Sequence, residues 1–205
     1  MSNPWENIHL DDYENHMKLD SVMQLQVMNE MMYDQFYRYP AKTMMILGIA
    51  GGNGLNHVRP EKIEKVYGVD INRDYLEACV QRYPKLKGIF ETVLCDLQKE
   101  NVDLPEAELL VANLFIEYVG YKNFQRAISK AAPKYASAII QINRADGFVS
   151  DSPYLHVFDD LNEVHHKIDR NGLIQAMDQI GYHHIFEIER ELPNGKGLLR
   201  LDFEK

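Results

Sequence analysis

Short apolar runs alternate with longer amphipathic stretches through most of the 205-residue chain. The apolar runs span residues 43–50, 65–71, 88–96, 107–115 and 135–143. Between them, apolar residues recur near the helical repeat at 72–86 and 121–132, and 52–60 is expected to begin another helix. Because the runs are apolar on both faces, this succession predicts a parallel sheet that is covered by helices.

The end of the chain has a different pattern. A helical stretch at 169–182 precedes two strand-like runs, 183–192 and 198–205, which flank the turn sequence PNGKG. Two strands joined by such a turn form a hairpin. The expected fold is therefore an α/β, Rossmann-like, doubly wound and mainly parallel sheet that finishes with an antiparallel hairpin strand.

The N-terminal part of the chain lies outside this pattern. Residues 8–38 carry apolar side chains near the helical repeat, at Met17, Val22, Leu25, Met28, Met32 and Phe36. We expect an amphipathic helical lead-in that ends before Pro40, in which Met28 and Met32 pack against the covering helices of the sheet. No repeat or linker-like tract divides the chain, so we expect one domain over 1–205, with 1–40 as an extension of the core at 41–205.

Composition narrows the class of protein. The net charge is −9, from 31 acidic and 22 basic residues, which disfavours a nucleic-acid partner. Cys79 and Cys95 have no ligand-like spacing, as expected for free thiols in a reducing compartment. The acidic N-terminal sequence lacks a basic segment followed by an apolar one, and no apolar run reaches about 18 residues. We expect a cytoplasmic protein without a membrane partner.

A glycine-rich segment, ILGIAGGNG at 46–54, follows the first predicted strand. This position is the carboxyl edge of a doubly wound sheet, where ligands of such folds bind. The spacing does not match the dinucleotide fingerprint G-x-G-x-x-G, because the segment from Gly52 reads GNGLNH, with His57 in place of the last glycine. A nicotinamide-dependent oxidoreductase is the alternative that this mismatch and the closing hairpin both disfavour.

The sequence MILGIAGGNG, followed by VYGVDIN, resembles the first two motifs of the class I S-adenosylmethionine-dependent methyltransferases. The closing hairpin matches as well, so the resemblance covers 43–205. It implies a seven-stranded sheet and S-adenosylmethionine as cofactor, with S-adenosylhomocysteine as its product. The positions that match the first motif, and would bind the cofactor, are Gly48, Ala50, Gly52 and Gly54.

Two of these positions depart from the family pattern. Gly48 stands where the family has an acidic residue that helps to hold the amino group of the methionine moiety. Either another side chain supplies that contact or the affinity is lower, and the backbone around Asn113 is a candidate. Ala50 replaces a glycine. The replacement adds a single methyl group, which the backbone tolerates if φ is negative at this position, as we expect.

Further cofactor contacts are implied at the next strand ends. Asp70 ends the second strand, where a carboxylate can accept hydrogen bonds from both ribose hydroxyls. The alternative is a surface aspartate or an N-cap of the helix near Arg73. The resemblance places Ile71 and Asn72 near the adenine. It also places Asp96 and Leu97 in contact with the adenine, although Asp96 could instead cap a helix or stabilise a turn. Asn113 would lie beside the methionine moiety.

Candidates for the acceptor side follow the fourth strand. A sulfonium is an activated electrophile, so the enzyme has to orient the nucleophile and remove its proton. Glu117 could act as a base or hold an amine substrate by its charge. Alternatively, it is a solvated carboxylate or interacts with the dipole of the following helix. Tyr118 is the second candidate and is adjacent in sequence. In similar small enzymes an N-terminal extension forms a lid, here with Trp5, Tyr13 and His16, and we expect 144–168 to form a second wall.

Several functions are less favoured. Residues 113–116 lack the Asn/Asp-Pro-Pro-aromatic motif that similar enzymes use on planar amides and nucleobases. The histidine doublets at 165–166 and 183–184 make poor chelates, because neighbouring side chains diverge, so we expect no metal. The predicted function is methyl transfer to a small-molecule acceptor, with a non-catalytic S-adenosylmethionine-binding protein as a further alternative. The acceptor atom and the oligomeric state stay open.

Overall fold

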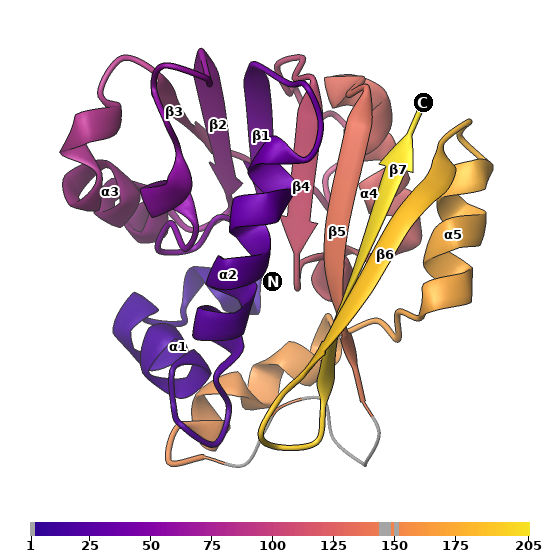
Figure 1. Cartoon of the computed structure of the whole chain (residues 1–205). Helices are drawn as coiled ribbons and strands as arrows, with labels where there is room; N and C mark the ends of the chain where they lie inside the picture. The colour runs from indigo at the N-terminus through magenta and orange to yellow at the C-terminus, as the bar shows by residue number, and fades with distance from the viewer. Residues whose placement is uncertain (1–2, 144–148, 150–151) are drawn as a thin grey trace.

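The computed structural model describes residues 3–143, 149 and 152–205. In this part of the chain seven strands form one sheet, in the order β3-β2-β1-β4-β5-β7-β6 (Figure 1). The strands are β1 Thr43–Leu47, β2 Lys65–Asp70, β3 Phe90–Leu94, β4 Leu109–Asn113, β5 Tyr135–Ile142, β6 His183–Glu191 and β7 Gly197–Glu204. Strands β1 to β5 pair in parallel, whereas β7 is antiparallel to both of its neighbours. The predicted sheet and its closing hairpin are confirmed.

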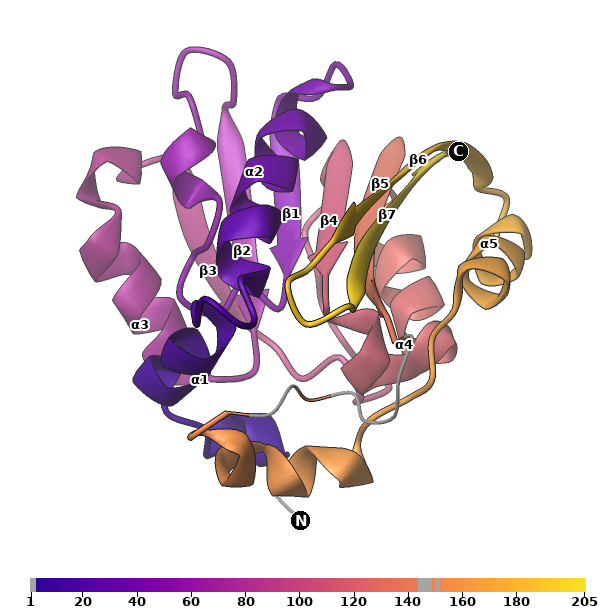
Figure 2. The ribbon, with the colours of Figure 1, turned by 60° about the horizontal axis from the view of Figure 1, so that its bottom comes forward.

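Helices cover both faces of the sheet, as Figure 2 shows. The helices are α1 Leu10–Met17, α2 Gln24–Tyr37, α3 Arg73–Arg82, α4 Ile116–Ala131 and α5 Arg170–Asp178. Side chains alternate along β1, so that Met44 packs with α2 and α3 in one apolar core, and Met45 packs with α4 and α5 in the other. Burial on both faces explains why the central strands β1, β4 and β5 have near-continuous apolar sequences.

The helix predicted to begin at 52–60 is absent, and only a short 3-10 turn, Leu55–His57, follows β1. Gly52 and Gly54 have φ values of +85° and +89°, in the left-handed region that a right-handed helix cannot include. The N-terminal helix α2 covers these strands instead. Met32 and Phe36 of α2 are buried in the same core as Met44, which confirms the predicted packing of the methionine stripe.

Two other helix predictions differ in their bounds. The N-terminal lead-in is not continuous, because a turn with Met23 at φ +51° separates α1 from α2. Helix α4 begins at Ile116 rather than at Tyr121, and Gly120, at φ +73°, interrupts it after its first turn. This early turn brings Glu117 and Tyr118 close to the end of β4, where the candidate site lies.

The part of the N-terminal extension that precedes α2, including α1, lies at the carboxyl edge of the sheet, at the bottom of Figure 1. A 3-10 helix at Leu155–Glu163 lies beside the N-terminal 3-10 turn Pro4–Glu6 at the same edge. The predicted second wall is thus described in part, since 144–148 and 150–151 lie outside the described residues. Ile8, Phe158 and Leu161 form a small apolar cluster that joins the two segments.

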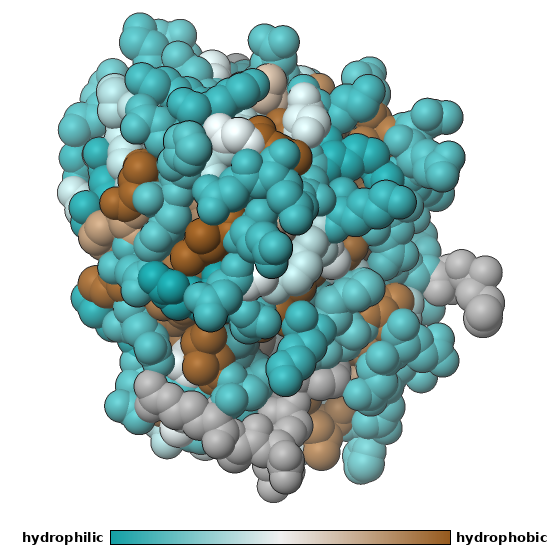
Figure 3. Space-filling model, turned by 90° about the vertical axis from the view of Figure 1, so that its right-hand side faces the viewer, coloured by the Kyte–Doolittle hydropathy of each residue, from teal (hydrophilic) through white to brown (hydrophobic). Residues whose placement is uncertain are grey.

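The side of the molecule seen in Figure 3 is largely hydrophilic, with apolar residues scattered over it. Among the helices of the described residues, none combines the length and the apolar composition that crossing a bilayer requires.

Candidate functional site

A cavity of about 650 Å³, counted with its open mouth, lies at the carboxyl ends of β1 to β4; we call it the strand-end cavity. The structure brings most of the predicted cofactor residues together in its lining: Gly48, Ala50, Asp70, Ile71, Asp96, Leu97 and Asn113. Gly52, Gly54 and Asn72, which were predicted with them, are not in the lining.

Asp70 is the buried carboxylate of this cavity, with 8% of the residue exposed. Its Oδ2 accepts a hydrogen bond from the Ala50 backbone N–H at 2.9 Å, and Oδ1 accepts one from the Asn72 N–H at 2.9 Å. Burial raises the pKa of Asp70, and these backbone hydrogen bonds oppose the rise. Each carboxylate oxygen has a second lone pair, so Asp70 can still accept hydrogen bonds from a ligand.

The alternative role of Asp70 as a helix cap is wrong, because Asn72 fills it. Asn72 Oδ1 accepts hydrogen bonds from the N–H groups of Asp74 and Tyr75 at the start of α3. Its Nδ2 donates to the Trp5 carbonyl oxygen at 2.9 Å. Asn72 therefore ties the N-terminal segment to the sheet beside the strand-end cavity.

The glycine-rich loop has backbone reasons for its composition. Ala50 has φ +46°, so the expectation of a negative φ there is wrong; its N–H is bonded to Asp70, which holds the loop in place. At Gly48, φ is +63°, and an added Cβ would overlap the ring of Phe115. The ring thus occupies space beside the position where the family has an acidic side chain.

Gly52 and Gly54 face other parts of the chain. A Cβ on Gly52 would lie 2.7 Å from Tyr83 Cε2, and a Cβ on Gly54 would lie 2.5 Å from Met32 Cε. These contacts are closer than a side chain permits, so packing and positive φ account for both glycines.

The ends of β3 and β4 supply the rest of the lining. Asp96 lines the cavity and also accepts a hydrogen bond from the Gln98 N–H at 2.9 Å, so the turn role considered for it is present as well. The side chains of Asn113 and Gln35 exchange two hydrogen bonds of 3.0 Å. Leu114 has φ +50°, an unfavourable conformation for a residue with a side chain, directly at the cavity.

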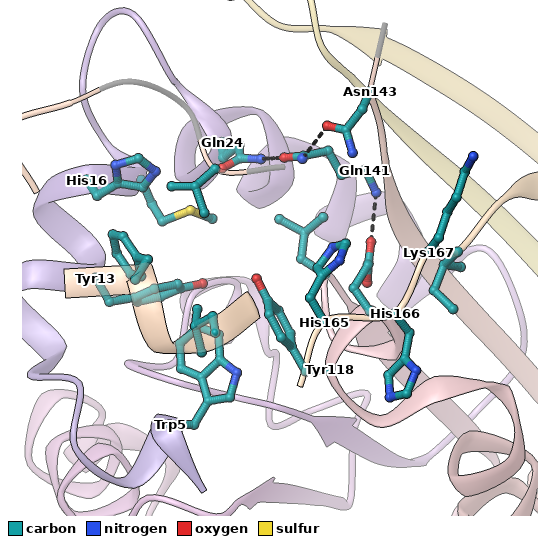
Figure 4. A pocket seen from close by; sticks show the side chains of 17 residues that line it. Trp5, Tyr13, His16, Gln24, Tyr118, Gln141, Asn143, His165, His166 and Lys167 are labelled. Atoms are coloured by element: carbon teal, nitrogen blue, oxygen red, sulfur yellow. Dashed lines mark hydrogen bonds between the residues drawn. The ribbon is translucent and has the colours of Figure 1, made fainter. Parts of the chain in front are cut away.

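A second cavity, of about 770 Å³ with its open mouth, lies under the N-terminal segment; we call it the lid cavity. The two cavities share four lining residues, which are Trp5, Tyr13, Leu114 and Tyr118. In Figure 4 the hydroxyls of Tyr13 and Tyr118 point toward each other. The Trp5 ring lies edge-on to both, with centroid distances of 5.8 Å to Tyr13 and 4.9 Å to Tyr118. These side chains form the wall between the cavities.

Glu117 lines the lid cavity and is 7% exposed, so its alternative role as a solvated carboxylate is wrong. Its Oε1 accepts a hydrogen bond from the Gln141 N–H at 2.9 Å, while the buried Oε2 has no hydrogen-bond partner. Burial raises the pKa of Glu117 to about 7, and the backbone hydrogen bonds oppose the rise. Glu117 can therefore change protonation state near neutral pH.

Tyr118, Tyr13 and His16, which were predicted for the acceptor side, also line the lid cavity. Burial raises the pKa of both tyrosines, so both hydroxyls stay protonated at neutral pH. His16 Nδ1 is 2.7 Å from Ser152 Oγ. Burial, with the nearby charge of Lys196, lowers the pKa of His16, which favours its neutral form.

Sequence reasoning missed a row of amide side chains in the lid cavity. Gln24 Nε2 donates to Gln141 Oε1, and Gln141 Nε2 donates to Asn143 Oδ1 at 2.7 Å (Figure 4). Gln141 and Asn143 are polar residues at the end of the apolar run 135–143, which is the signal that could have identified them. No group of three potential metal ligands occurs within 3–143, 149 and 152–205.

Comparison with known proteins bears on the fold. No family model and no curated protein matches the sequence. The structure is similar to the N-methyltransferase NodS from Bradyrhizobium japonicum WM9, with a TM-score of 0.67 and 10% identity over 100% of this chain and 99% of that one. It is also similar to geranyl diphosphate C-methyltransferase from Streptomyces coelicolor A3(2), with a TM-score of 0.65 and 10% identity over 87% and 77% of the two chains.

The [4+2]-cyclase SpnF is similar to the same degree, with a TM-score of 0.66 and 7% identity over 90% of this chain and 82% of that one. One fold can carry different reactions, so the likeness identifies the architecture. Together with the strand order and the antiparallel β7, these similarities show that the chain has the fold of the class I methyltransferases.

Proposed function

We propose that the protein is an S-adenosylmethionine-dependent methyltransferase that acts on a small-molecule acceptor. The observation that carries the proposal is the meeting of two cavities at one aromatic wall, with a buried carboxylate in each. Methyl transfer needs a donor and an acceptor that approach each other in a site shielded from water, and two adjoining cavities can provide such a site. The fold is that of proteins crystallised with S-adenosylmethionine or its product.

The strand-end cavity fits the cofactor. The free lone pairs of Asp70 would accept hydrogen bonds from the ribose hydroxyls, while Asp96, Leu97 and Ile71 would contact the adenine. The main chain at Asn113 would hold the methionine moiety. Gly48 and Ala50 would let the backbone approach the ligand closely. When bound, the cofactor supplies an electrophilic methyl group at a sulfonium.

The chain's own residues would then place the acceptor. Trp5, Tyr13 and Tyr118 close the wall against water, and the two hydroxyls can orient a polar group beside the wall. Glu117 would receive the proton that the acceptor loses.

Ligand binding by the purified protein tests the cofactor. S-adenosylhomocysteine should raise the melting temperature, because a ligand of the native state stabilises it, and NAD should not. Stabilisation by NAD alone would favour the oxidoreductase instead.

Asp70→Ala should weaken S-adenosylhomocysteine binding by about 1.5–3 kcal/mol in a calorimetric titration. Asp74→Ala, which changes an exposed aspartate on α3, should leave the affinity unchanged. Equal affinity in both variants would contradict the ribose role.

Transfer of the methyl group has to be measured separately from binding of the cofactor. Incubation with labelled S-adenosylmethionine and a metabolite extract, followed by mass analysis, should place the label on a small molecule. Binding of the cofactor without any labelled product would favour the non-catalytic alternative.

A further inference from the structure

The lid cavity contains one buried carboxyl group. Among the described residues that line it, Glu117 is the carboxylate, and its Oε2 is buried without a donor. Oε1 is fixed by the backbone N–H of Gln141, whose side chain is the middle member of the amide row. A buried carboxylate oxygen without a partner is costly, so a ligand that donates a hydrogen bond to it would bind favourably.

Among the described residues that line the cavity, no buried side chain is a cation that compensates the Glu117 carboxylate; the buried Lys196, whose charge acts on His16, lies outside the lining. The titratable groups that line it besides Glu117 are Tyr13 and His16 of α1, Tyr118 of α4, and His165, His166 and Lys167 of the segment before α5. Burial, with the nearby His166, lowers the pKa of His165, as burial lowers that of His16, so both favour the neutral form. His166 and Lys167 are exposed, at the rim. The interior therefore favours a positively charged ligand.

The aromatic residues of the cavity point to the same kind of ligand. Trp5, Tyr13 and Tyr118 form a cluster, and the His165 ring lies 6.1 Å from that of Tyr118. Aromatic faces attract cations, more strongly where water is excluded. Because three of these side chains also line the strand-end cavity, a cation held among them lies next to the proposed methyl donor.

We propose that the acceptor is an amine, which binds in the lid cavity as an ammonium ion with an N–H directed at Glu117 Oε2, and that Glu117 takes this proton. The proposal rests on the proposed function. Transfer of the proton to the carboxylate leaves a neutral amine with a free lone pair. That lone pair forms the N–C bond while the bond between sulfur and the methyl carbon breaks. The electron pair of the broken bond remains on sulfur, which becomes a neutral thioether. The nitrogen regains the positive charge, and Glu117 releases its proton to water.

Other acceptors fit the cavity less well. A carboxylic acid would place a second negative charge beside Glu117. An alcohol could donate a hydrogen bond to Oε2 but would leave the carboxylate and the aromatic faces without a cation.

The test uses acceptors that differ only in their reacting group. The full-length protein is incubated with labelled S-adenosylmethionine and benzylamine, benzyl alcohol or benzoic acid, and with the corresponding butyl and 2-phenylethyl sets. We expect label on the nitrogen of amines. Glu117→Gln should lower kcat/KM for the amine by about 100-fold or more without changing S-adenosylhomocysteine affinity, whereas Glu106→Gln, an exposed control, should change neither.

A binding measurement gives a second readout. The amine should raise the melting temperature of the S-adenosylhomocysteine complex more than the matching alcohol does, and Glu117→Gln should abolish the difference. Label on alcohols or acids instead of amines, no labelled amine in any set, or full activity of Glu117→Gln would overturn the inference. If S-adenosylhomocysteine itself does not bind, the proposed function fails; if it binds and amines are not labelled, only the amine inference fails.

Discussion

The carboxyl group of Glu117 is buried, and burial favours its neutral, protonated form. Its pKa is raised from 4.5 to about 7, chiefly by burial, so the folded state holds the proton more tightly than the unfolded state does. Without ligand, the carboxylate therefore costs no stability below about pH 4.5. The cost grows as the pH rises toward 7, and above that it reaches about 3 kcal/mol. A cationic ligand would offset this cost by pairing with the charge.

Glu117→Gln should remove this pH dependence, because the amide does not titrate. Relative to wild type, the free energy of unfolding of the variant should be about 3 kcal/mol larger at pH 8 than at pH 4.5, which means that the variant is the more stable protein at pH 8 by that additional amount. Urea unfolding of the ligand-free proteins at both pH values measures the difference. A constant offset between the two proteins would show that folding does not raise the pKa of Glu117.

At the scale of elements, the segment after β1 departs most from the expected helix. A right-handed helix cannot include Gly52 and Gly54 at their φ values, and α2 packs on the strands that such a helix would cover. The loop is fixed at two ends, by the Asp70 bond to Ala50 and by the contact of Gly54 with Met32. One end lies in the strand-end cavity and the other lies against α2.

Substitution by alanine should affect stability and ligand affinity differently at the two ends of the loop. Gly54→Ala introduces a left-handed alanine, which costs about 1–2 kcal/mol, and also displaces Met32. We expect reduced stability in urea unfolding with little change in S-adenosylhomocysteine affinity, because Gly54 does not line the cavity. Gly48→Ala should reduce that affinity as well, since the added methyl group displaces the Phe115 ring in the cavity wall. Equal losses of affinity would contradict this division of the loop.

The elements that the sequence could predict depend on short-range patterns. The apolar runs predicted β1 to β5, and the two strand-like runs around the PNGKG turn predicted the hairpin of β6 and β7, because these signals lie within a few residues. The helix at 52–60 failed because nothing in the apolar pattern shows that two glycines adopt positive φ. The same limit applies to Ala50, whose left-handed backbone is held by Asp70, 20 residues away.

At the scale of the whole molecule, a buried polar network joins both ends of the chain. Arg200 of β7 bonds Asp34 of α2 and the fully buried Asp202, with distances of 2.7 and 2.6 Å. Asp202 also accepts a hydrogen bond from Ser137 of β5. The sequence could not predict these contacts, because the paired residues are far apart in the chain and no local pattern distinguishes buried from exposed charges.

The network reaches the strand-end cavity through Gln35. This fully buried side chain donates to Ser137 Oγ at 2.8 Å and exchanges two hydrogen bonds with Asn113, which lines the cavity. Gln35 therefore fixes the orientation of the Asn113 side chain from the N-terminal helix, 78 residues away. The N-terminal extension consequently acts in two ways at the site, since it covers the cavities and also positions a residue beneath them.

Gln35→Leu should separate these effects. The substitution leaves the amide of Asn113 and the hydroxyl of Ser137 with fewer partners, which should cost about 1–3 kcal/mol of stability. Because Asn113 loses its fixed orientation at the cavity, we expect weaker S-adenosylhomocysteine binding at temperatures where the variant is fully folded. Gln81→Leu, on the exposed face of α3, is the matched control and should change neither quantity. If Gln35→Leu loses stability but binds with wild-type affinity, Gln35 supports the fold alone and Asn113 does not depend on it to meet the ligand.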